Sequence, residues 1–317
     1  MLVWLLRRLA LSVVLVWLVA SIVFMAIHLV PGDPAELLLS QGGGTPSEAA
    51  IQALRTELGL DRPIFVQYFE AMERLLHFDL GRSMQDGVPI FDEVAKRLPR
   101  TLELILAAAI VSVAIAIPAG TYAALRAGGP FDRIFSTLAG LSLAVPVFVV
   151  GTLLVLVFAQ YLRWLPAGQF VPFSRNPGRH MLILIMPSLT IASSLLPIIF
   201  RMTRSSVLDV MQMDFVRTAR AKGVRPLRIV FHHIVRAALT PVVTVLALHM
   251  GALLGGTVLV EYVFNWPGLS GLLVSAVNAR DYPAVVGVIL VISVVFVLLN
   301  LFVDVLYGLI DPRGKRA

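Results

Sequence analysis

The sequence predicts an all-α polytopic membrane protein, with six transmembrane helices and a small helical insertion after the first of them. Two observations support this fold class. The 317 residues are 58% hydrophobic and 14% charged, with a mean hydropathy of +0.88, whereas soluble domains are roughly half apolar and about a quarter charged. The apolar residues also gather in six runs that lack Asp, Glu, Lys and Arg, and a helix needs roughly 20 such residues to cross a bilayer core.

Each apolar run is one expected span. In chain order, the runs are Leu9–Val30, Leu104–Leu125, Ile134–Leu162, Met181–Phe200, Ala237–Val260 and Ala284–Val303. The first run follows two arginines, as in a secretory signal peptide. Its 22 residues exceed a signal's apolar region and no small-x-small cleavage site follows, so we expect a retained span. The third run is longer than one straight span requires, and we expect it to tilt or to bend at Pro146.

The Lys and Arg residues predict the orientation of the chain. With the N-terminus in the cytoplasm, the cytoplasmic side holds 15 of them and the short outer loops hold four. Short cytoplasmic loops are enriched in these residues, so we expect a multi-pass protein of the cytoplasmic (inner) membrane with both termini inside. The net charge of +7 and the pI of about 10.2 then reflect loops beside the lipid bilayer, and nucleic acid is not an expected partner.

The chain divides into four expected parts. Residues 1–30 hold the N-terminal tip and the first span, 31–98 form an extracytoplasmic domain, 99–308 hold the other five spans, and 309–317 form a cytoplasmic tail. In the second part, Ser47–Leu58 and Asp61–Met72 are typical of short helices, the first with Thr45 or Ser47 as its cap. A loop without fixed structure is the open alternative for this part.

The sequence lacks the motifs of an enzyme. It has no cysteine and no phosphate-binding loop, because its one Gly-Lys pair, Gly314–Lys315, is followed by Arg316. His232 and His233 are adjacent, so on a helix their side chains point about 100° apart and cannot share a metal as an i, i+4 pair does. We therefore expect no catalytic residue, no metal and no cofactor in this chain. Any transport must draw its energy from an ion gradient or from a separate chain.

A few polar residues interrupt or border the spans. His249 lies within the fifth span, Asn300 and Asp304 lie four residues apart near the end of the sixth, and Glu261 follows the fifth. Ionisable residues inside spans are typical of gradient-driven transporters, so a proton or ion relay is one interpretation. Hydrogen bonding between helices is the other, and the small number of such residues favours it.

The most informative segment is the basic loop at 201–236. It contains the run DFVRTARAKG from Asp214 to Gly223, in which helix-forming residues lead to a glycine that can end a helix with positive φ. Arg225, Pro226 and Leu227 then restart the chain, with proline suited to a first helical turn. The pattern predicts helix, turn and helix, and such a short helix can dock in a groove of a partner. A basic loop that touches anionic lipid is the alternative interpretation.

This segment is similar to the cytoplasmic loop in the membrane subunits of ATP-binding-cassette (ABC) importers, specifically the dipeptide/oligopeptide permease family. The wider class has the loop pattern E-A-A-x3-G, which this chain matches at Ala219 and Gly223, whereas the peptide-permease version fits the whole run. The order and spacing of the segments resemble the first of two paired membrane subunits. The other resembling segments are LVPGDP at 29–34, LGLDRP at 58–63, DLGRS at 79–83, RLPRTLEL at 97–104, VFNWPGL at 263–269, ARDYP at 279–283, NLFVD at 300–304 and DPR at 311–313.

The resemblance implies a fold, a function and partners. It implies a type I ABC importer permease that forms the pore together with a homologous second permease subunit. One or two ABC ATPase subunits would bind ATP and Mg²⁺, and an extracytoplasmic substrate-binding protein would deliver di- or oligopeptides or related small solutes. The residues implied to couple the pore to an ATPase subunit are Asp214, Arg217, Thr218, Ala219, Arg220, Ala221, Lys222 and Gly223.

Small residues in the fifth span are candidates for subunit packing. Gly251, Ala252, Gly255 and Gly256 would let a neighbouring helix approach closely. That helix could belong to the second subunit or to the same chain. Two functions of other classes also stay open at this point: a gradient-driven carrier that acts without an ATPase, and a membrane scaffold with no transport of its own.

Overall fold

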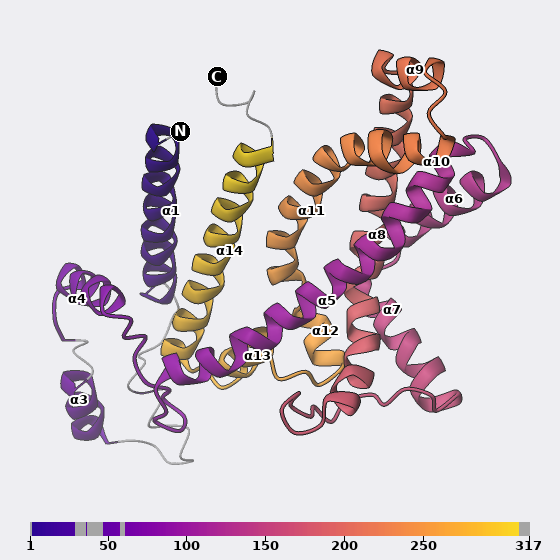
Figure 1. The fold of residues 1–317 in the computed structure, drawn as a ribbon. Helices are drawn as coiled ribbons and strands as arrows, with labels where there is room; N and C mark the ends of the chain where they lie inside the picture. Colours follow the sequence, from indigo (N-terminus) through magenta and orange to yellow (C-terminus); the bar gives the residue numbers. More distant parts are fainter. Residues whose placement is uncertain (1, 29–35, 37–46, 58–60, 311–317) are drawn as a thin grey trace. The chain divides into compact units, whose positions relative to one another are not determined.

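A computed structural model describes residues 2–28, 36, 47–57 and 61–310 (Figure 1). Regular structure in these residues is helical, apart from one isolated antiparallel bridge between Arg82 and Pro89. Five of the described helices are long and apolar enough to cross a membrane, and one strongly bent pair gives a sixth if it is counted as a single span. The predicted all-α polytopic class is therefore confirmed, with five or six spans in the described residues. The chain forms two compact units, one built mainly on Leu98–Gly271 and the other on Arg7–Arg97 with Leu272–Val297.

The larger unit follows the chain from the second span to the end of the fifth. Four helices have residues in both units: α1 (Leu2–His28), α5 (Ile90–Leu125), α13 (Leu269–Asn278) and α14 (Tyr282–Ile310). The elements of the larger unit, with two π-helices written as η, are α5 (Ile90–Leu125), α6 (Pro130–Ala144), α7 (Val147–Leu154), η1 (Val155–Tyr161), α8 (Pro177–Met211), α9 (Asp214–Ala221), α10 (Pro226–Arg228), η2 (Ile229–Val235), α11 (Arg236–Gly256) and α12 (Val258–Val263).

The third span is bent, as its length predicted. α6 and the continuous pair α7–η1 meet at 104° across Val145 and Pro146. Val145 adopts an extended conformation, with φ −92° and ψ 125°, because the ring of the following proline disfavours the helical region. Pro146 then caps α7. The predicted bend at Pro146 is confirmed.

Two helices extend beyond the apolar runs that predicted them. α8 continues past Phe200 to Met211, so the first eleven residues of the loop expected at 201–236 are helical. α5 begins at Ile90 and runs without a break across the domain boundary expected between residues 98 and 99. Charged residues end an apolar run without ending a helix, since Arg, Glu, Lys, Leu and Met are all good helix formers.

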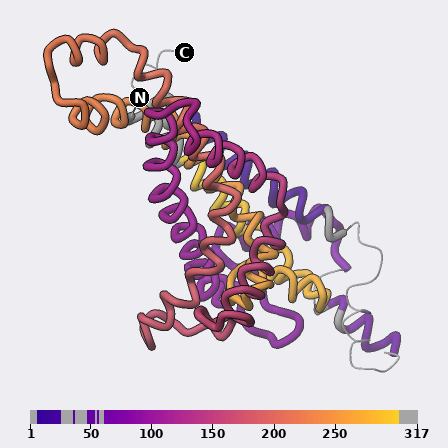
Figure 2. The backbone as a smooth tube through the Cα atoms, turned by 90° about the vertical axis from the view of Figure 1, so that its right-hand side faces the viewer, coloured from indigo at the N-terminus to yellow at the C-terminus, as the bar shows by residue number. Residues whose placement is uncertain are grey.

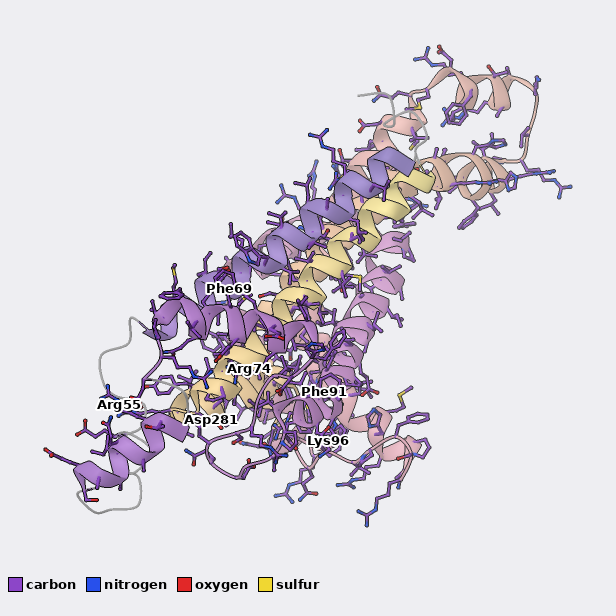
Figure 3. The ribbon with its side chains drawn as sticks, turned by 90° about the vertical axis from the view of Figure 1, so that its left-hand side faces the viewer. Arg55, Phe69, Arg74, Phe91, Lys96 and Asp281 are labelled. Carbon is purple, nitrogen blue, oxygen red and sulfur yellow. The ribbon has the colours of Figure 1, made fainter. Side chains whose placement is uncertain are left out.

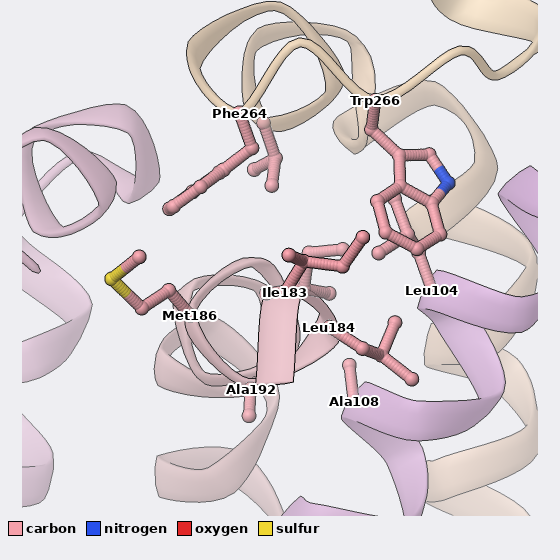
Figure 4. Close-up of a cluster of buried hydrophobic side chains, with 10 residues drawn as sticks. Leu104, Ala108, Ile183, Leu184, Met186, Ala192, Phe264 and Trp266 are labelled. Atoms are coloured by element: carbon pink, nitrogen blue, oxygen red, sulfur yellow. The ribbon is translucent and has the colours of Figure 1, made fainter. Parts of the chain in front are cut away.

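Two apolar clusters hold α8 against α5. The first contains Leu104, Ala108, Ile183, Leu184, Met186, Ile191, Ala192, Val260, Phe264 and Trp266 (Figure 4). The second places Ala116 and Ala123 of α5 beside Ile199 and Phe200 of α8. Gly120 allows this approach, because a Cβ there would lie 2.8 Å from the Phe200 carbonyl oxygen. α8 thus packs against α5 from Ile183 to Phe200, and its last eleven residues lie beyond the buried residues of these two clusters.

The smaller unit contains α1 (Leu2–His28), α3 (Glu48–Glu57) and α4 (Ile64–Leu76) (Figure 3). α3 and α4 are the short helices predicted at 47–58 and 61–72. The Ser47 side chain accepts a hydrogen bond from the backbone N–H of Ala50 (3.3 Å), whereas Thr45, the other expected cap, lies outside the described residues. Tyr68 of α4 shares a hydrogen bond with Ser21 of α1 (2.7 Å). Within this unit, α4 is therefore attached to the first span.

Candidate functional site

The segment around α9 adopts the predicted helix and turn. Asp214 lies in the first turn of α9, where its negative charge suits the helix dipole. The helix ends at Gly223, whose φ of +71° is the left-handed conformation that glycine adopts at no steric cost. The N–H of Val224 bonds to the carbonyl of Ala219 (3.2 Å), and that of Gly223 to the carbonyl of Arg220 (3.0 Å). This pair of bonds is a Schellman motif, which terminates a helix sharply.

The chain restarts directly after this stop. Pro226 occupies the first turn of α10, as the sequence predicted, and α10 continues into η2 and α11. A short helix and a tight turn therefore lie between α8 and the fifth span, and the second predicted helix is the beginning of that span, Pro226–Gly256. Figure 2 shows this segment as a loop that stands out from the rest of the larger unit.

One face of α9 is buried against the chain itself. Val216 is fully buried and Ala219 is 8% exposed, in a cluster with Val207 and Val210 of α8 and Ile234 of η2. Ala219 is one of the residues implied to couple the pore to an ATPase subunit, and that role stays a prediction. Its side chain lies on the face that packs α9 onto α8 and η2, so Ala219 positions the helix.

The opposite face of α9 and the following turn are exposed and basic. Seven of the eight residues implied for coupling are exposed, namely Asp214, Arg217, Thr218, Arg220, Ala221, Lys222 and Gly223. Arg225 and Arg228 add positive charge, and exposed apolar side chains lie among these cations: Phe215 (43%), Leu227 (73%) and Phe231 (69%). Large apolar groups surrounded by charge are typical of a docking surface for a protein partner. We call the exposed residues from Asp214 to Phe231 the α9 surface.

An ion pair ties α8 to α6 about two turns before the end of α8. Arg204 of α8 donates through two nitrogens to both carboxylate oxygens of Asp132 in α6, at 2.5 and 2.8 Å. Asp132 is 4% exposed and also accepts from the backbone N–H of Gly128 and the hydroxyl of Ser136. Two forked bonds fix orientation as well as distance. Neither residue was predicted as a site, because they lie 72 residues apart in the sequence and only the fold brings them together.

A second polar cluster lies where α5, α12 and α13 meet. Glu261 is 1% exposed, and its carboxylate accepts from the hydroxyl of Thr101 (2.7 Å) and the backbone N–H of Gly271 (3.0 Å). Thr101 in turn accepts from the N–H of Leu269 (2.9 Å). A Cβ at Gly268 would overlap the Glu261 carboxylate. Two resembling segments, at 97–104 and 263–269, are thus joined by buried hydrogen bonds, which the sequence did not reveal.

The beginning of α8 carries a third polar contact. His180 is fully buried, with Nδ1 2.7 Å from the Val171 carbonyl oxygen and Nε2 2.6 Å from a carboxylate oxygen of Glu103. The rings of Phe170 and Trp266 lie edge-on to it. Because a carbonyl oxygen can only accept, Nδ1 carries a proton and donates it to Val171. The contact ties α8 to α5 and to the segment before α8, and no local pattern in the sequence indicates it.

The other predicted residues are not brought together into a site. Gly251 is buried in its own chain, whereas Gly255 and Gly256 are exposed, and a Cβ at either would meet no atom within 4 Å. His249 is half-buried and makes no hydrogen bond with the described residues. The Asp304 side chain lies outside the described residues, so the relay prediction is untested. The rings of His232 and His233 are 5.7 Å apart, and neither belongs to a group of three His, Asp or Glu residues that could hold a metal among the described residues.

Comparison with known proteins shows what the chain is similar to. Residues 116–316 match a family described as binding-protein-dependent transport system inner membrane component, and residues 1–105 match the N-terminal model of such membrane components. The chain is 38% identical over 311 residues to a probable peptide ABC transporter permease of Sinorhizobium fredii, with 98% of each chain covered. It is 39% identical over 312 residues to the glutathione transport system permease GsiC of Escherichia coli, again with 98% of each covered. It is 36% identical over 339 residues to the dipeptide transport system permease DppB of Escherichia coli, with 100% of this chain and 99% of the relative covered.

Proposed function

The chain belongs to the family of binding-protein-dependent transport system inner membrane components, and we propose that it forms half of the pore of an ATP-driven importer of short peptides. A homologous permease subunit supplies the other half. The named relatives carry peptides, dipeptides or glutathione, which is itself a tripeptide, and this supports a peptide-like solute. Both termini lie in the cytoplasm in this proposal, which the distribution of Lys and Arg supports.

The α9 surface is the docking site for an ABC ATPase subunit. The observation that carries this assignment is the two-faced geometry of α9. Val216 and Ala219 anchor the helix to its own chain, while Phe215, Arg217 and Arg220 face outward. An aromatic side chain among cations suits a partner cleft that is apolar at its centre and acidic at its rim. ATP, Mg²⁺ and hydrolysis belong to that partner, and no cofactor belongs to this chain.

The contacts around α8 give the docked helix a route to the spans. A displacement of α9 would move the end of α8, because Val216 packs against Val207 and Val210. It would then reach α6 through the pair Asp132–Arg204. The start of α8 is held by His180 and Glu103. A helix fixed at one end and pulled at the other pivots, and such a motion can open and close a pathway between two subunits.

Charge reversal on the α9 surface tests the docking role. Arg217→Glu with Arg220→Glu reverses two exposed charges and leaves the buried face of α9 intact. We expect at least a tenfold fall in co-purification of the ATPase subunit and in peptide uptake into cells, since complementary charges guide such docking. The matched control is Arg175→Glu, because Arg175 is also exposed but precedes α8 and lies outside the α9 surface. Normal membrane levels with unchanged ATPase binding and uptake in the double variant would reject the assignment.

The two alternative functions, a gradient-driven carrier and a scaffold, predict different uptake from that of an ATP-driven importer. A gradient-driven carrier would transport after removal of every ATPase chain, and a scaffold would leave uptake unchanged when deleted. The relatives named above are ABC permeases, so they give the carrier no support. Uptake assays in a deletion strain and in ATPase-free vesicles distinguish the three functions.

A further inference from the structure

The smaller unit contains a cavity of about 260 Å³ that the proposed function does not use. Its walls come from the turn at 83–88, the first turns of α5, the second half of α13 and the residues that begin α14. All of these residues belong to the same unit. Ligand pockets commonly measure about 300–1,000 Å³. The cavity therefore suits a small molecule of one or two amino-acid residues.

Two chain segments far apart in sequence hold the walls in place. Asp281 is 3% exposed, and its carboxylate accepts a hydrogen bond from the hydroxyl of Ser83 (2.5 Å). It also accepts one from the backbone N–H of Ala284 (3.2 Å), so Asp281, labelled in Figure 3, caps α14. The side-chain amide of Gln85 donates to the Ala279 carbonyl (3.0 Å). Both Asp281 oxygens are engaged, so this carboxylate builds the wall. The cavity is thus fixed by buried hydrogen bonds before any ligand arrives.

The polar groups that line the cavity have opposite charges. Arg97 donates through Nε to Glu93 (3.1 Å), and its terminal nitrogens have no hydrogen-bond partner in the part of the chain that the structure describes. A free guanidinium end matches a carboxylate, to which it can donate two parallel bonds. Asp86 offers the opposite charge. The hydrogen bond from the backbone N–H of Val88 lowers the pKa of Asp86 below its usual value, so the group is ionised at neutral pH.

Apolar side chains complete the lining. Val88, Ile90 and Leu272 face the same cavity. A divalent cation does not fit this lining, because Arg97 carries positive charge and the described residues include no group of three His, Asp or Glu that could hold a metal. A ligand with a carboxylate, an ammonium and an apolar body matches all three parts of the surface.

We propose that this cavity binds a small zwitterion, a free amino acid or a dipeptide, with Arg97 holding the carboxylate and Asp86 the ammonium. The proposal deepens the proposed function, since it rests on a peptide-like solute. It gives this chain a binding site of its own for that class of solute, separate from any binding protein. The ligand's side chain would lie against Ile90 and Leu272.

The test measures ligand binding without transport. The chain, purified with its partner subunits into nanodiscs and free of the binding protein, is titrated with L-alanyl-L-alanine and followed by saturation-transfer NMR. We expect a dissociation constant on the order of 1 mM, as suits a small ligand with few contacts. The C-terminal amide and the N-acetyl form of the dipeptide should each bind about tenfold more weakly, because each lacks one charge.

Three variants separate the cavity from general effects on folding. Arg97→Gln should weaken dipeptide binding about tenfold. Lys96→Gln is the control, because Lys96 also contacts Glu93 but does not line the cavity. Ser275 is exposed and lines the cavity. Ser275→Leu should therefore fill the cavity without changing its charge and abolish dipeptide binding. Equal binding by wild type and Arg97→Gln, or no saturable binding by wild type at about 100 mM, would overturn the proposal.

The outcome is independent of the coupling assignment. The Arg217→Glu, Arg220→Glu variant changes the larger unit only, so it should bind dipeptide as the wild type does. If that variant loses uptake while the wild type binds no dipeptide, the cavity proposal fails and the importer function stands. If dipeptide binds through Arg97 but the charge-reversed variant still imports, the docking assignment fails instead.

Discussion

The two ends of α8 are held by different kinds of contact. At the start, His180 is buried between Glu103 and the Val171 carbonyl. At the other end, α9 is seated by the small apolar side chains Val216 and Ala219. Buried polar groups tolerate one geometry, because a displaced donor or acceptor loses its partner at a cost of about 1–3 kcal/mol. Apolar contacts are non-directional and tolerate small shifts. The comparison suggests a fixed start and a movable end.

The largest loss of stability is expected at the ion pair between α6 and α8. This pair is a polar contact near the end of α8 that is otherwise held by apolar side chains. Arg204→Ala leaves the buried Asp132 carboxylate without its cation, and we expect a loss of about 3 kcal/mol in the free energy of unfolding. Thermal unfolding in detergent measures it. Asp132→Asn with Arg204→Gln removes both charges and should recover part of the loss. If Arg204→Ala is as stable as the wild type, the ion pair does not tie α6 to α8.

Removal of the Glu261 carboxylate should have the next largest effect. Glu261→Ala leaves the Thr101 hydroxyl and the Gly271 N–H without their acceptor, at an expected cost of about 2–3 kcal/mol. Glu261→Gln keeps one acceptor oxygen and should lose about half as much. If both variants unfold at the wild-type temperature, these buried hydrogen bonds do not stabilise the junction of α5, α12 and α13.

Two glycines allow a finer comparison of steric clash at the junction. Gly268→Ala places a methyl group on the Glu261 carboxylate, and we expect a loss of about 1–3 kcal/mol. Gly255→Ala is the matched control, because a Cβ there meets no atom within 4 Å. Equal unfolding temperatures for the two would argue against a tight junction. A larger side chain tests subunit packing. If Gly255→Leu no longer co-purifies with the second permease subunit while Gly255→Ala still does, the interface between the subunits lies at Gly255.

The smallest expected effect is at the end of α9. Gly223→Ala introduces no clash, but its φ of +71° costs an alanine about 1 kcal/mol. Global stability should change little, while amide hydrogen exchange within α9 should accelerate about fivefold, because the Schellman bonds weaken. Unchanged exchange in α9 would mean that the glycine stop does not hold this helix.

Much of the fold could be predicted from the sequence because it depends on local signals. Hydropathy located the spans, Pro146 marked the bend in the third, and Gly223 marked the end of α9. The likeness to peptide permeases, drawn from short segments, is confirmed by relatives that match almost the whole chain. Helix ends were less accurate, because α5 and α8 extend through charged residues.

The contacts between distant residues could not be predicted in this way. Thr101 and Glu261 are 160 residues apart, and His180 and Glu103 are 77 apart, so no local pattern pairs them. The burial of Ala219, in contrast, has a local signal in the sequence. Val216 and Ala219 are three residues apart among charged neighbours, and this spacing marks the buried face of an amphipathic helix.

Site-directed cross-linking tests the central claim most directly, and the chain suits it because it contains no cysteine. Thr218→Cys lies on the exposed face of α9, and Ala219→Cys lies on the buried face one position along. Native membranes carrying either variant are treated with a short bifunctional maleimide, and the captured chain is identified by mass spectrometry. The account predicts that Thr218→Cys captures an ABC ATPase chain and that Ala219→Cys does not. Capture by neither variant, or equal capture by both, would contradict it.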